Sequence, residues 1–333
     1  MGSTARDYEY QAPVLSQRNG SVTGTPAAEF NVTLELVRKL LASQFPQYAH
    51  RALQPLDSGF DNVLFRLGED LLVRMPRRAV ANDLIRNEQT WLPRLSSQLD
   101  IRVPQAIHRG VPEFGYPWSF SLLPWLPGTA ADLAYPNVSE APRFAQFLLD
   151  LHRIRSPNPA LAPANAVRGV PLAERRGVVE ERFARLQQEG VLKHSDFSHL
   201  EQLWRLALAQ DTVKESVWLH GDLHARNVLV ENGAIVAVID WGDITSGDWA
   251  TDVASLWMLF DDEKAIGLAL HHLQADAALI ARARGWAFSF ATMLVDSGRV
   301  DNPRHEAMGY RTFKALASAT HPDERQNQSN KTK

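Results

Sequence analysis

The sequence predicts an α+β fold with two lobes, a small lobe built on an antiparallel sheet and a larger, mainly helical lobe after it. Three observations support this expectation. The 333-residue chain is long enough for two core-forming units. Its first β-like runs lie before Pro127 and Gly128, whereas helical periodicity dominates after them. Strands followed by helices in this order are typical of an α+β plan.

The chain is expected to divide into four segments. They are a disordered N-terminal tail (1–29), an N-lobe (30–126), a C-lobe (127–320) and a disordered C-terminal tail (321–333). The tails are polar and lack hydrophobic periodicity. Because the chain contains no run of 18 apolar residues and no secretory h-region, we expect no membrane partner and a cytoplasmic location.

Short-range patterns predict the elements of the N-lobe. In order, we expect a helix ending before Pro46, hairpin strands at 62–67 and 71–75, and a helix at 79–97 that Pro93 kinks or stops. A further apolar run, at 118–126, precedes Pro127. The two hairpin strands are separated by a turn at 68–70. A small antiparallel sheet is therefore expected to begin near residue 62.

The C-lobe is expected to be helical with one embedded hairpin. In order, we expect a helix at 141–154, an irregular Pro-rich connection at 156–171, a helical segment at 172–210, strands at 217–219 and 227–239, and helices within 251–319. Asn232 and Gly233 interrupt the apolar run 227–239. Asn-Gly between apolar runs is a strong signal for a two-residue hairpin turn.

Composition excludes several classes of function. The 35 Lys and Arg residues against 38 Asp and Glu give a net charge of -3, so no global positive field favours a nucleic acid partner. The chain has no cysteine, which excludes disulfides, thiolate metal sites and cysteine nucleophiles.

Three oxygen-bearing side chains are expected to meet at the open end of the hairpin. If its turn centres on Asn232-Gly233, paired positions sum to about 465, which brings Asn227 close to Asp240. Asp222 lies five residues before Asn227. Carboxylate and amide oxygens suit Mg²⁺, which fills its remaining positions with phosphate and water.

The spacing of these residues resembles two protein-kinase elements. His220-x-Asp222 with Asn227 five residues after the Asp is similar to the kinase catalytic loop, and Asp240-Trp241-Gly242 is similar to the D-F-G element. The sequence HGDLHARN…IDWGD resembles the aminoglycoside phosphotransferase family, which includes macrolide phosphotransferases. The resemblance implies a kinase-like fold and transfer of the γ-phosphoryl group of ATP or GTP to a hydroxyl of a small molecule, an antibiotic such as an aminoglycoside or a macrolide.

The resemblance also implies roles for single residues. Asp222 is expected to be the catalytic base, and Asn227 and Asp240 are expected to hold Mg²⁺ beside the nucleotide phosphates. We interpret His220 as a structural brace of the loop. His224 and Arg226 either contact phosphate or face water.

A second expected pair lies in the N-lobe. Glu88 falls within the apolar stripe of its helix, where a carboxylate needs a partner, and Arg74 in the strand 71–75 is available. This pair resembles the Lys and Glu with which kinases fix nucleotide phosphates, although Arg replaces Lys here. Around it, the resemblance implies further nucleotide-binding residues: Gly59 and Asn62 in the loop 57–62, and Leu123 and Trp125 near the nucleotide base.

The remaining acids of the hairpin region receive other expected roles. We expect Asp243 to support the metal site from outside, and Asp248 and Asp252 to cap the helix that follows, because acids favour helix N-termini.

The sequence leaves the acceptor open. An acidic triplet at 261–263 favours a cationic aminoglycoside or is a solvated helix end. An aromatic set lines an apolar cavity for a macrolide or belongs to the core. Its members are Trp257, Phe260, Trp286, Phe288, Phe290 and Met293.

Two functions from other classes also stay open. One is a metal-dependent hydrolase that uses His220, Asp222 and His224, which alternate along an extended segment. The other is a catalytically silent, kinase-like binding protein.

Overall fold

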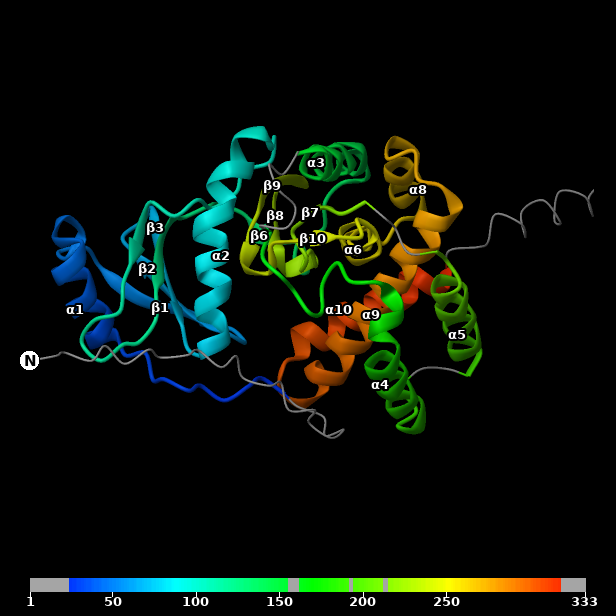
Figure 1. The fold of residues 1–333 in the computed structure, drawn as a ribbon, viewed down its shortest axis with the longest axis horizontal. Helices are drawn as coiled ribbons and strands as arrows, with labels where there is room; N and C mark the ends of the chain where they lie inside the picture. The colour runs from blue at the N-terminus through cyan, green and yellow to red at the C-terminus, as the bar shows by residue number, and fades with distance from the viewer. Residues whose placement is uncertain (1–23, 155–161, 192–193, 212–214, 319–333) are drawn as a thin grey trace, which may run out of the picture.

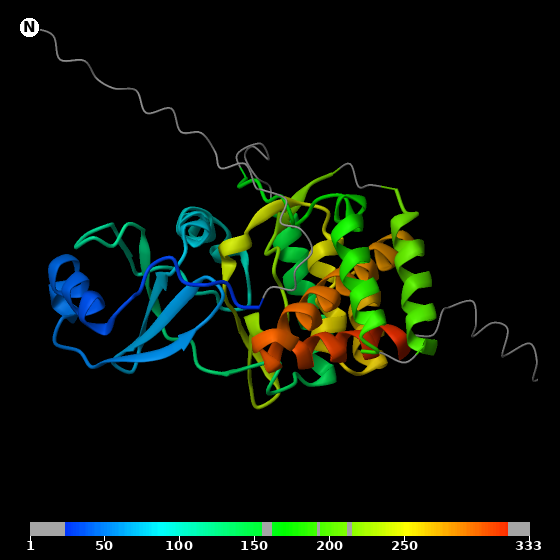
Figure 2. The same ribbon diagram turned by 90° about the horizontal axis from the view of Figure 1, so that it is seen from below.

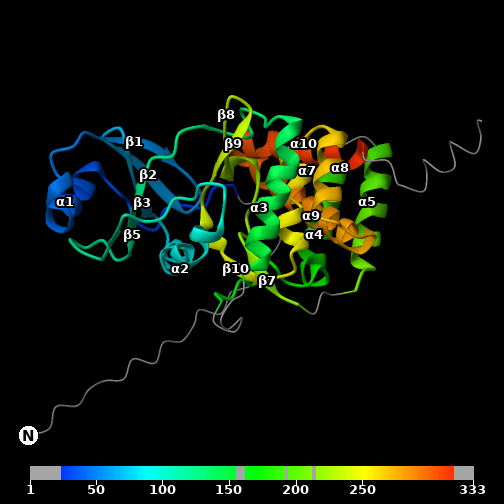
Figure 3. The same ribbon diagram turned by 90° about the horizontal axis from the view of Figure 1, so that it is seen from above.

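The computed structural model describes residues 24–154, 162–191, 194–211 and 215–318. An antiparallel sheet with helix α1 lies at one end of the molecule and the helices α4, α5 and α8 lie at the other, with α2 between the two parts (Figures 1 and 3). The predicted α+β architecture, with an antiparallel sheet first and a helical region after it, is confirmed. Of the tails expected at 1–29 and 321–333, only residues 24–29 lie within the described residues.

The N-terminal sheet has the strand order β1-β2-β3-β5-β4. Its strands are β1 (Leu53–Ser58), β2 (Asn62–Leu67), β3 (Leu71–Pro76), β4 (His108–Gly110) and β5 (Phe120–Pro124). The predicted β2–β3 hairpin is confirmed, with Leu67 opposite Leu71. Sequence reasoning missed β1 because this edge strand contains Pro55 and buries only its first residue, so no alternation marks it.

Two helices complete this part of the chain. Helix α1 (Leu34–Gln44) places Val37, Leu40 and Leu41 against the sheet in one hydrophobic core. Helix α2 (Ala79–Leu95) continues through Pro93 and ends two residues later. Its last buried residues belong to the separate core of the helical region, so α2 joins the sheet to that region.

The chain enters the helical region through a short three-stranded sheet. Gly128 has φ +128°, and β6 (Thr129–Ala130), directly after it, pairs with β8 (Val228–Glu231). β9 (Ala234–Val238) completes this sheet. A separate two-stranded sheet is formed by β7 (Val217–Leu219), which precedes β8 in the chain, and β10 (Thr245–Gly247), which follows β9.

The described part of the helical region contains eight α-helices, one of which is the long helix α9. They are α3 (Ala141–Arg153), α4 (Arg176–Gln188), α5 (His194–Leu208), α6 (Ala250–Val253), α7 (Leu256–Leu259), α8 (Glu263–His272), α9 (Ala277–Asp301) and α10 (Pro303–Ser318). α9 is buried on nearly all sides, as expected of a helix at the centre of a bundle. Among the described helices, none is long and apolar enough to cross a membrane.

The helical segment expected at 172–210 is interrupted after α4. Gly190 has φ +66°, and its N–H donates to the Gln187 carbonyl while that of Val191 donates to the Leu186 carbonyl. This pair of hydrogen bonds is the Schellman motif, which ends a helix at a left-handed residue.

Candidate active site

The predicted hairpin carries the candidate site. Asn232 has φ 52° and Gly233 has φ 80°, the two positive values of a type I′ turn. The pairs Glu231–Ala234 and Val230–Ile235 have the expected register, but an irregularity between Leu229 and Val230 shifts it, so that Val228 lies opposite Val238.

Asn227 is fixed directly against the residue expected to be the base. Its Nδ2 donates to the Asp222 carbonyl oxygen at 2.8 Å and lies 3.5 Å from the Asp222 carboxylate. Because Nδ2 is engaged, Oδ1 is the atom that Asn227 offers to a cation. The Asp222 carboxylate is only 20% exposed.

Asp240 follows β9 in a strained conformation. Its φ of 61° and ψ of 66° place a non-glycine residue in the left-handed region. Such strain costs about 1–3 kcal/mol and occurs mainly at functional sites. The side chain is 49% exposed, and its Oδ1 lies 2.5 Å from Nη2 of Arg74.

The expected pair of Arg74 and Glu88 forms in the structure. Arg74 Nη1 donates to Glu88 Oε2 at 2.8 Å, and the two side chains are 6% and 2% exposed. The same Oε2 accepts the backbone N–H of Trp241 at 2.9 Å. Burial raises the pKa of the Glu88 carboxyl, and the opposing charges of Asp240 and Glu88 raise that of Arg74 despite its burial. Arg74 therefore joins α2 to the Asp240 loop.

His220 has the structural role that we expected. Its Nε2 donates to the Ile239 carbonyl at 3.0 Å and its Nδ1 accepts the Asp222 N–H at 3.3 Å. Both ring nitrogens are thus bound to the backbone. The hydrolase alternative requires His220 as a metal ligand, and this arrangement leaves it no nitrogen for that purpose.

Asp252 does not cap the helix that follows, so that expectation is wrong. Its two carboxylate oxygens accept the backbone N–H groups of His220 and Gly221, at 2.8 and 2.9 Å. Gly221 has φ +84°, and a Cβ there would lie 2.5 Å from the Asp243 carbonyl oxygen. Asp252 therefore holds the loop before the base. Asp248, in contrast, accepts the N–H of Ala250 at the start of α6.

Arg168 is a site residue that sequence reasoning missed. It lies in the irregular connection between α3 and α4, and its Nη2 donates to Asp222 Oδ1 at 2.6 Å. Although burial raises it, the pKa of Asp222 is held below its ordinary value by the charge of Arg168 and by the neighbouring histidines. Asp222 is therefore ionised at neutral pH. No sequence signal places Arg168 there, because the contact joins residues 54 positions apart.

Asp243 contacts the same connection. Asn165 donates to Asp243 Oδ1 at 2.8 Å, while its own Oδ1 accepts the backbone N–H groups of Val167 and Arg168. Burial, followed by the charge of Asp222, raises the pKa of Asp243. Asp243 thus anchors the loop that carries Arg168.

The loop expected to cover phosphates, at 57–62, connects β1 and β2 and contacts the helical region. Phe60 stacks on His305 of α10 with ring centroids 5.3 Å apart. Arg226 lies 2.9 Å from His305 Nε2 and 3.5 Å from the Asp57 carboxylate. His305 accepts this hydrogen bond as a neutral ring, because burial and the nearby His224 and Arg226 lower its pKa to about 4.

Gly59 and Asn62, the two residues of that loop expected to bind nucleotide, lie directly after β1 and at the start of β2. Gly59 donates its N–H to the Asn62 carbonyl at 2.9 Å, and a Cβ on Gly59 would meet no atom closer than 3.9 Å. Asn62 lies opposite Pro76 in the sheet, and its Oδ1 is enclosed without a partner among the described residues.

Leu123 and Trp125 lie where the chain leaves the sheet. Leu123 is buried in β5 opposite Leu72. The Trp125 N–H donates to the Asp70 carbonyl at 2.7 Å, and Arg66 covers its ring at 3.7 Å. The Trp125 N–H is therefore engaged within the sheet region and is not available to a nucleotide base.

His224 also lies in the site. Its Nε2 lies 3.4 Å from Asp222 Oδ2, and burial lowers its pKa. Neither His224 nor Arg226 simply faces water.

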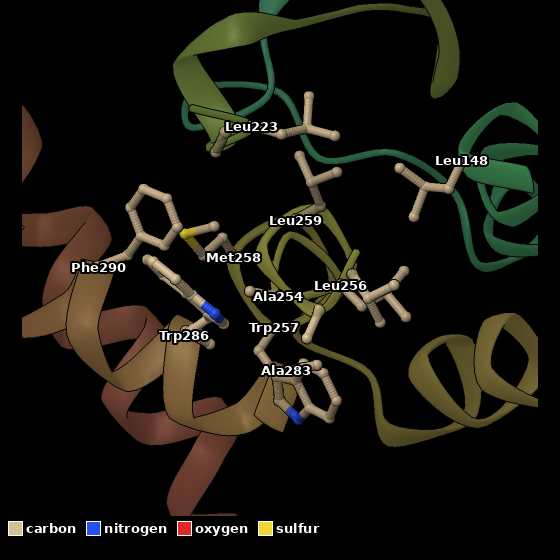
Figure 4. Close-up of a cluster of buried hydrophobic side chains, with 14 of the residues drawn as sticks. Leu148, Leu223, Ala254, Leu256, Trp257, Met258, Leu259, Ala283, Trp286 and Phe290 are labelled. Atoms are coloured by element: carbon tan, nitrogen blue, oxygen red, sulfur yellow. The ribbon is translucent and has the colours of Figure 1, made fainter. Parts of the chain in front are cut away.

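The two acceptor clues have structural explanations. The aromatic set is packed into the core: Trp257, Phe260, Trp286, Phe288 and Phe290 are each 3% exposed or less, and Met293 packs against them. Figure 4 shows Trp286 and Phe290 of α9 against Met258. In the acidic triplet, Asp262 caps α8 by accepting the Lys264 N–H, and Asp261 lies 3.3 Å from Arg311.

A divalent cation fits the donor set of this site. Asn227 Oδ1 and the half-exposed carboxylate of Asp240 are hard oxygen ligands of the type that Mg²⁺ prefers. In the described ranges, no group of three or more His, Asp or Glu side chains is arranged to hold a metal ion.

The chain is similar to known proteins in sequence and in fold. The sequence model of the phosphotransferase enzyme family matches residues 52–286, well over half of the chain. No curated protein matches the chain in sequence.

Several solved structures share the fold. The GDP and kanamycin complex of APH(2")-IIia has a TM-score of 0.64 and 17% identity, covering 84% of this chain and 97% of that one. The streptomycin-ATP-APH(2")-IIa ternary complex has a TM-score of 0.54 and 19% identity, covering 79% and 91%. The apoenzyme of macrolide 2'-phosphotransferase MphH from Brachybacterium faecium has a TM-score of 0.55 and 21% identity, covering 86% and 99%. The expected kinase-like fold is confirmed.

Proposed function

Because the chain belongs to the phosphotransferase enzyme family, as its motifs predicted, we propose that it transfers the γ-phosphoryl group of ATP or GTP to a hydroxyl of a small molecule. The observation that carries this proposal is the closeness of three residues. Asn227 Nδ2 donates to Asp222, and the Asn227 carbonyl accepts the N–H of Ile239, the residue directly before Asp240, at 2.8 Å. Their spacing in the sequence is similar to that of the base and the metal ligands of kinases, which supports the same roles here.

The nucleotide is proposed to lie between the sheet and the helical region. Arg74 is fixed by Glu88 with its other guanidinium nitrogen directed at Asp240, a position from which it can bind phosphate oxygens. The 57–62 loop, with Gly59 and Asn62, would cover the phosphates, and Leu123 and Trp125 would border the base. Structural neighbours described with GDP and with ATP support a nucleotide donor.

Mg²⁺ is proposed to bind Asn227 Oδ1 and Asp240. When bound, it would neutralise charge on the nucleotide phosphates. Arg74 contacts Asp240 through Oδ1, which leaves Oδ2 to the cation.

Asp222 is proposed to be the base. The acceptor oxygen forms a bond to the γ-phosphorus as the bond from that phosphorus to the bridging oxygen breaks, and the hydroxyl proton passes to the Asp222 carboxylate. Asp222 is ionised at neutral pH, so it can accept this proton. Asn227, by binding the Asp222 carbonyl, fixes the carboxylate relative to the metal position.

Release of nucleoside diphosphate tests the proposal. Purified chain is incubated with Mg²⁺ and ATP or GTP against panels of small alcohols, aminoglycosides and macrolides, the last two because structural neighbours are named for them. Asp222→Asn should lower the transfer rate by about 10²–10⁴-fold, which is the usual contribution of acid–base catalysis, and should retain nucleotide binding.

Asp83→Asn, an exposed aspartate on α2, is the matched control and should keep full activity. Equal transfer rates for Asp222→Asn and the unmodified chain would contradict the assignment of the base. Nucleotide binding without turnover of any acceptor would instead favour the silent binding protein.

A further inference from the structure

Arginine side chains gather beside the base from the connection after α3 and from α4. Arg168 binds Asp222 at 2.6 Å, and its guanidinium lies over the Phe290 ring, 4.5 Å from the centroid. Asn165, which donates to Asp243, accepts the backbone N–H of Arg168. Arg168 is thus held on two sides beside the atom that must accept the hydroxyl proton.

Three more arginines belong to this cluster: Arg175 and Arg182 lie close enough to Arg168 to feel its charge, and Arg185 lies beside Arg182. Arg182 and Arg185 of α4 share the Asp296 carboxylate, at 3.6 and 2.9 Å, and Arg185 also lies 3.6 Å from the mostly exposed Glu181. The side chain of Arg175, in the turn before α4, has no hydrogen bond or ion pair in the part of the chain that the structure describes. Its Nε is enclosed without a partner, and so is that of Arg168.

One charge of this cluster has no ion-pair partner. Arg168 pairs with Asp222, and Arg182 and Arg185 share Asp296. No carboxylate among the described residues lies within ion-pair distance of Arg175. Burial, followed by the like charges of Arg168 and Arg182, lowers the pKa of Arg175 to about 10, so it remains protonated at neutral pH. A half-buried cation without a partner beside other cations is costly, and an anionic ligand would compensate that cost.

We propose that the acceptor carries an anionic group, a carboxylate or a phosphate, near the hydroxyl that is phosphorylated, and that Arg168 and Arg175 bind it. This inference rests on the proposed function and names the substrate class of the same site. Guanidinium groups bind planar or tetrahedral oxyanions through paired hydrogen bonds, which fixes orientation as well as position. An acceptor anion on Arg168 also takes over its contact with Asp222, leaving the Asp222 carboxylate to the hydroxyl.

The cluster disfavours a cationic acceptor. A polyamine bound beside Asp222 would meet Arg168 and Arg175, and like charges brought together cost binding free energy. The acidic triplet at 261–263 does not offset this, because Asp261 pairs with Arg311 and Asp262 caps α8.

A binding experiment tests the anion site without a known substrate. With the nucleotide site saturated by Mg²⁺ and ADP, sulfate is titrated into the chain and the melting temperature is followed, with chloride at equal ionic strength as the blank. Sulfate should stabilise the unmodified chain and Arg176→Gln, the matched control at the exposed neighbouring arginine. Arg175→Gln should weaken the apparent sulfate affinity at least about tenfold, and Arg175→Lys should restore part of it.

Arg175→Gln removes a charge that has no partner, so it is not expected to impair folding. Equal sulfate affinity in Arg175→Gln and the unmodified chain overturns the inference, as does the absence of any sulfate effect beyond chloride.

An acceptor panel separates this inference from the proposed function. Hydroxycarboxylates and sugar phosphates form its two anionic arms, and neutral alcohols, macrolides and aminoglycosides form the others. We expect turnover in an anionic arm, with Arg175→Gln raising the acceptor KM at least about tenfold at an unchanged nucleotide KM. Asp222-dependent turnover confined to the neutral or cationic arms overturns the anion site and leaves the proposed function standing. Failure to bind Mg²⁺-nucleotide overturns the proposed function, and the sulfate titration, then run without nucleotide, still decides on the anion site.

Discussion

A single carboxylate oxygen of Glu88 connects the sheet, helix α2 and the Asp240 loop. It accepts from Arg74 on the strand and from the Trp241 N–H of the loop. Removing one partner of such a buried pair typically costs about 3–5 kcal/mol, because the other charge is left without compensation. Sequence reasoning found Arg74 because a Glu in an apolar stripe needs a partner. It did not find the Trp241 N–H, since a backbone donor carries no side-chain signal.

The contacts that sequence reasoning missed share one property. Arg168 contacts Asp222 across 54 positions, and Asp252 contacts His220 across 32. Local motifs identify Asp222 and Asn227 because their spacing is short. Residues that arrive from a distant loop or helix become visible only when the chain is folded.

His305 predicts a stability change in mild acid. Its pKa of about 4 lies below the ordinary value of 6.5, so the unfolded chain binds more protons between these pH values. The folded state is therefore fully stabilised above about pH 6.5 and loses this contribution as the pH falls toward 4. Between pH 7 and pH 5 the loss from this group amounts to about 2 kcal/mol.

Urea denaturation at both pH values measures this effect. His305→Gln should reduce the difference between the two unfolding free energies, whereas His50→Gln, at an exposed histidine, should leave it as in the unmodified chain. An unchanged difference in His305→Gln would show that the ring of His305 is not held neutral in the folded state.

At the scale of elements, the hairpin that carries Asn227 and Asp240 was the part best predicted. Asn-Gly fixed the turn, since only residues that tolerate positive φ form it. The register irregularity between Leu229 and Val230, which also pair with β6, was not predictable, because no residue type marks it in the sequence.

Two glycine substitutions should have opposite effects on stability. Gly233→Ala places a Cβ 2.3 Å from Asn137 Nδ2 at a residue with φ +80°, and the left-handed conformation alone costs about 1–2 kcal/mol. Gly267→Ala, in the interior of α8 where a Cβ would meet no atom within 4 Å, should stabilise the chain by about 0.5–1 kcal/mol.

Unfolding free energies of the two variants, compared with that of the unmodified chain, check this pair. No loss of stability in Gly233→Ala would show that the turn geometry does not limit the stability of the hairpin. A loss in Gly267→Ala would contradict the open space expected around a Cβ in α8.

At the scale of the whole molecule, the order of a sheet followed by helices was predictable. The way in which the sheet is joined to the helical region was not. The change from period-two to helical patterning along the chain reveals the order. The sheet and α1 form one core, while α2 ends in the core of the helical region. The amphipathic pattern of α2 indicates that the helix buries one face, but it does not indicate which part of the molecule that face packs against.

Mg²⁺-nucleotide should stabilise the folded chain by linkage. At a concentration of about a hundred times its Kd, a ligand that binds only the folded state adds about 2.7 kcal/mol to the unfolding free energy. Because Asp240 is proposed to hold the cation, Asp240→Asn should lose most of this gain, and EDTA should remove it from the unmodified chain.

Thermal unfolding with and without nucleotide provides the measurement. Asp83→Asn and Asp222→Asn should keep the gain, since neither residue is proposed to bind the metal. A full gain in Asp240→Asn would place the cation elsewhere.

Residues 24–29 cross from one part of the molecule to the other. Figure 2 shows this stretch, in blue, running from α1 towards the helical region. Thr25 donates its N–H and hydroxyl to Asp301 at the end of α9, and Glu29 accepts the Ala79 N–H at the start of α2. For anyone who shortens the chain for crystallisation or attaches an affinity tag, the cut or the junction therefore belongs before Gly24. A protease that cleaves between Thr25 and Glu29 would break the covalent link between the contact with α9 and the contact with α2.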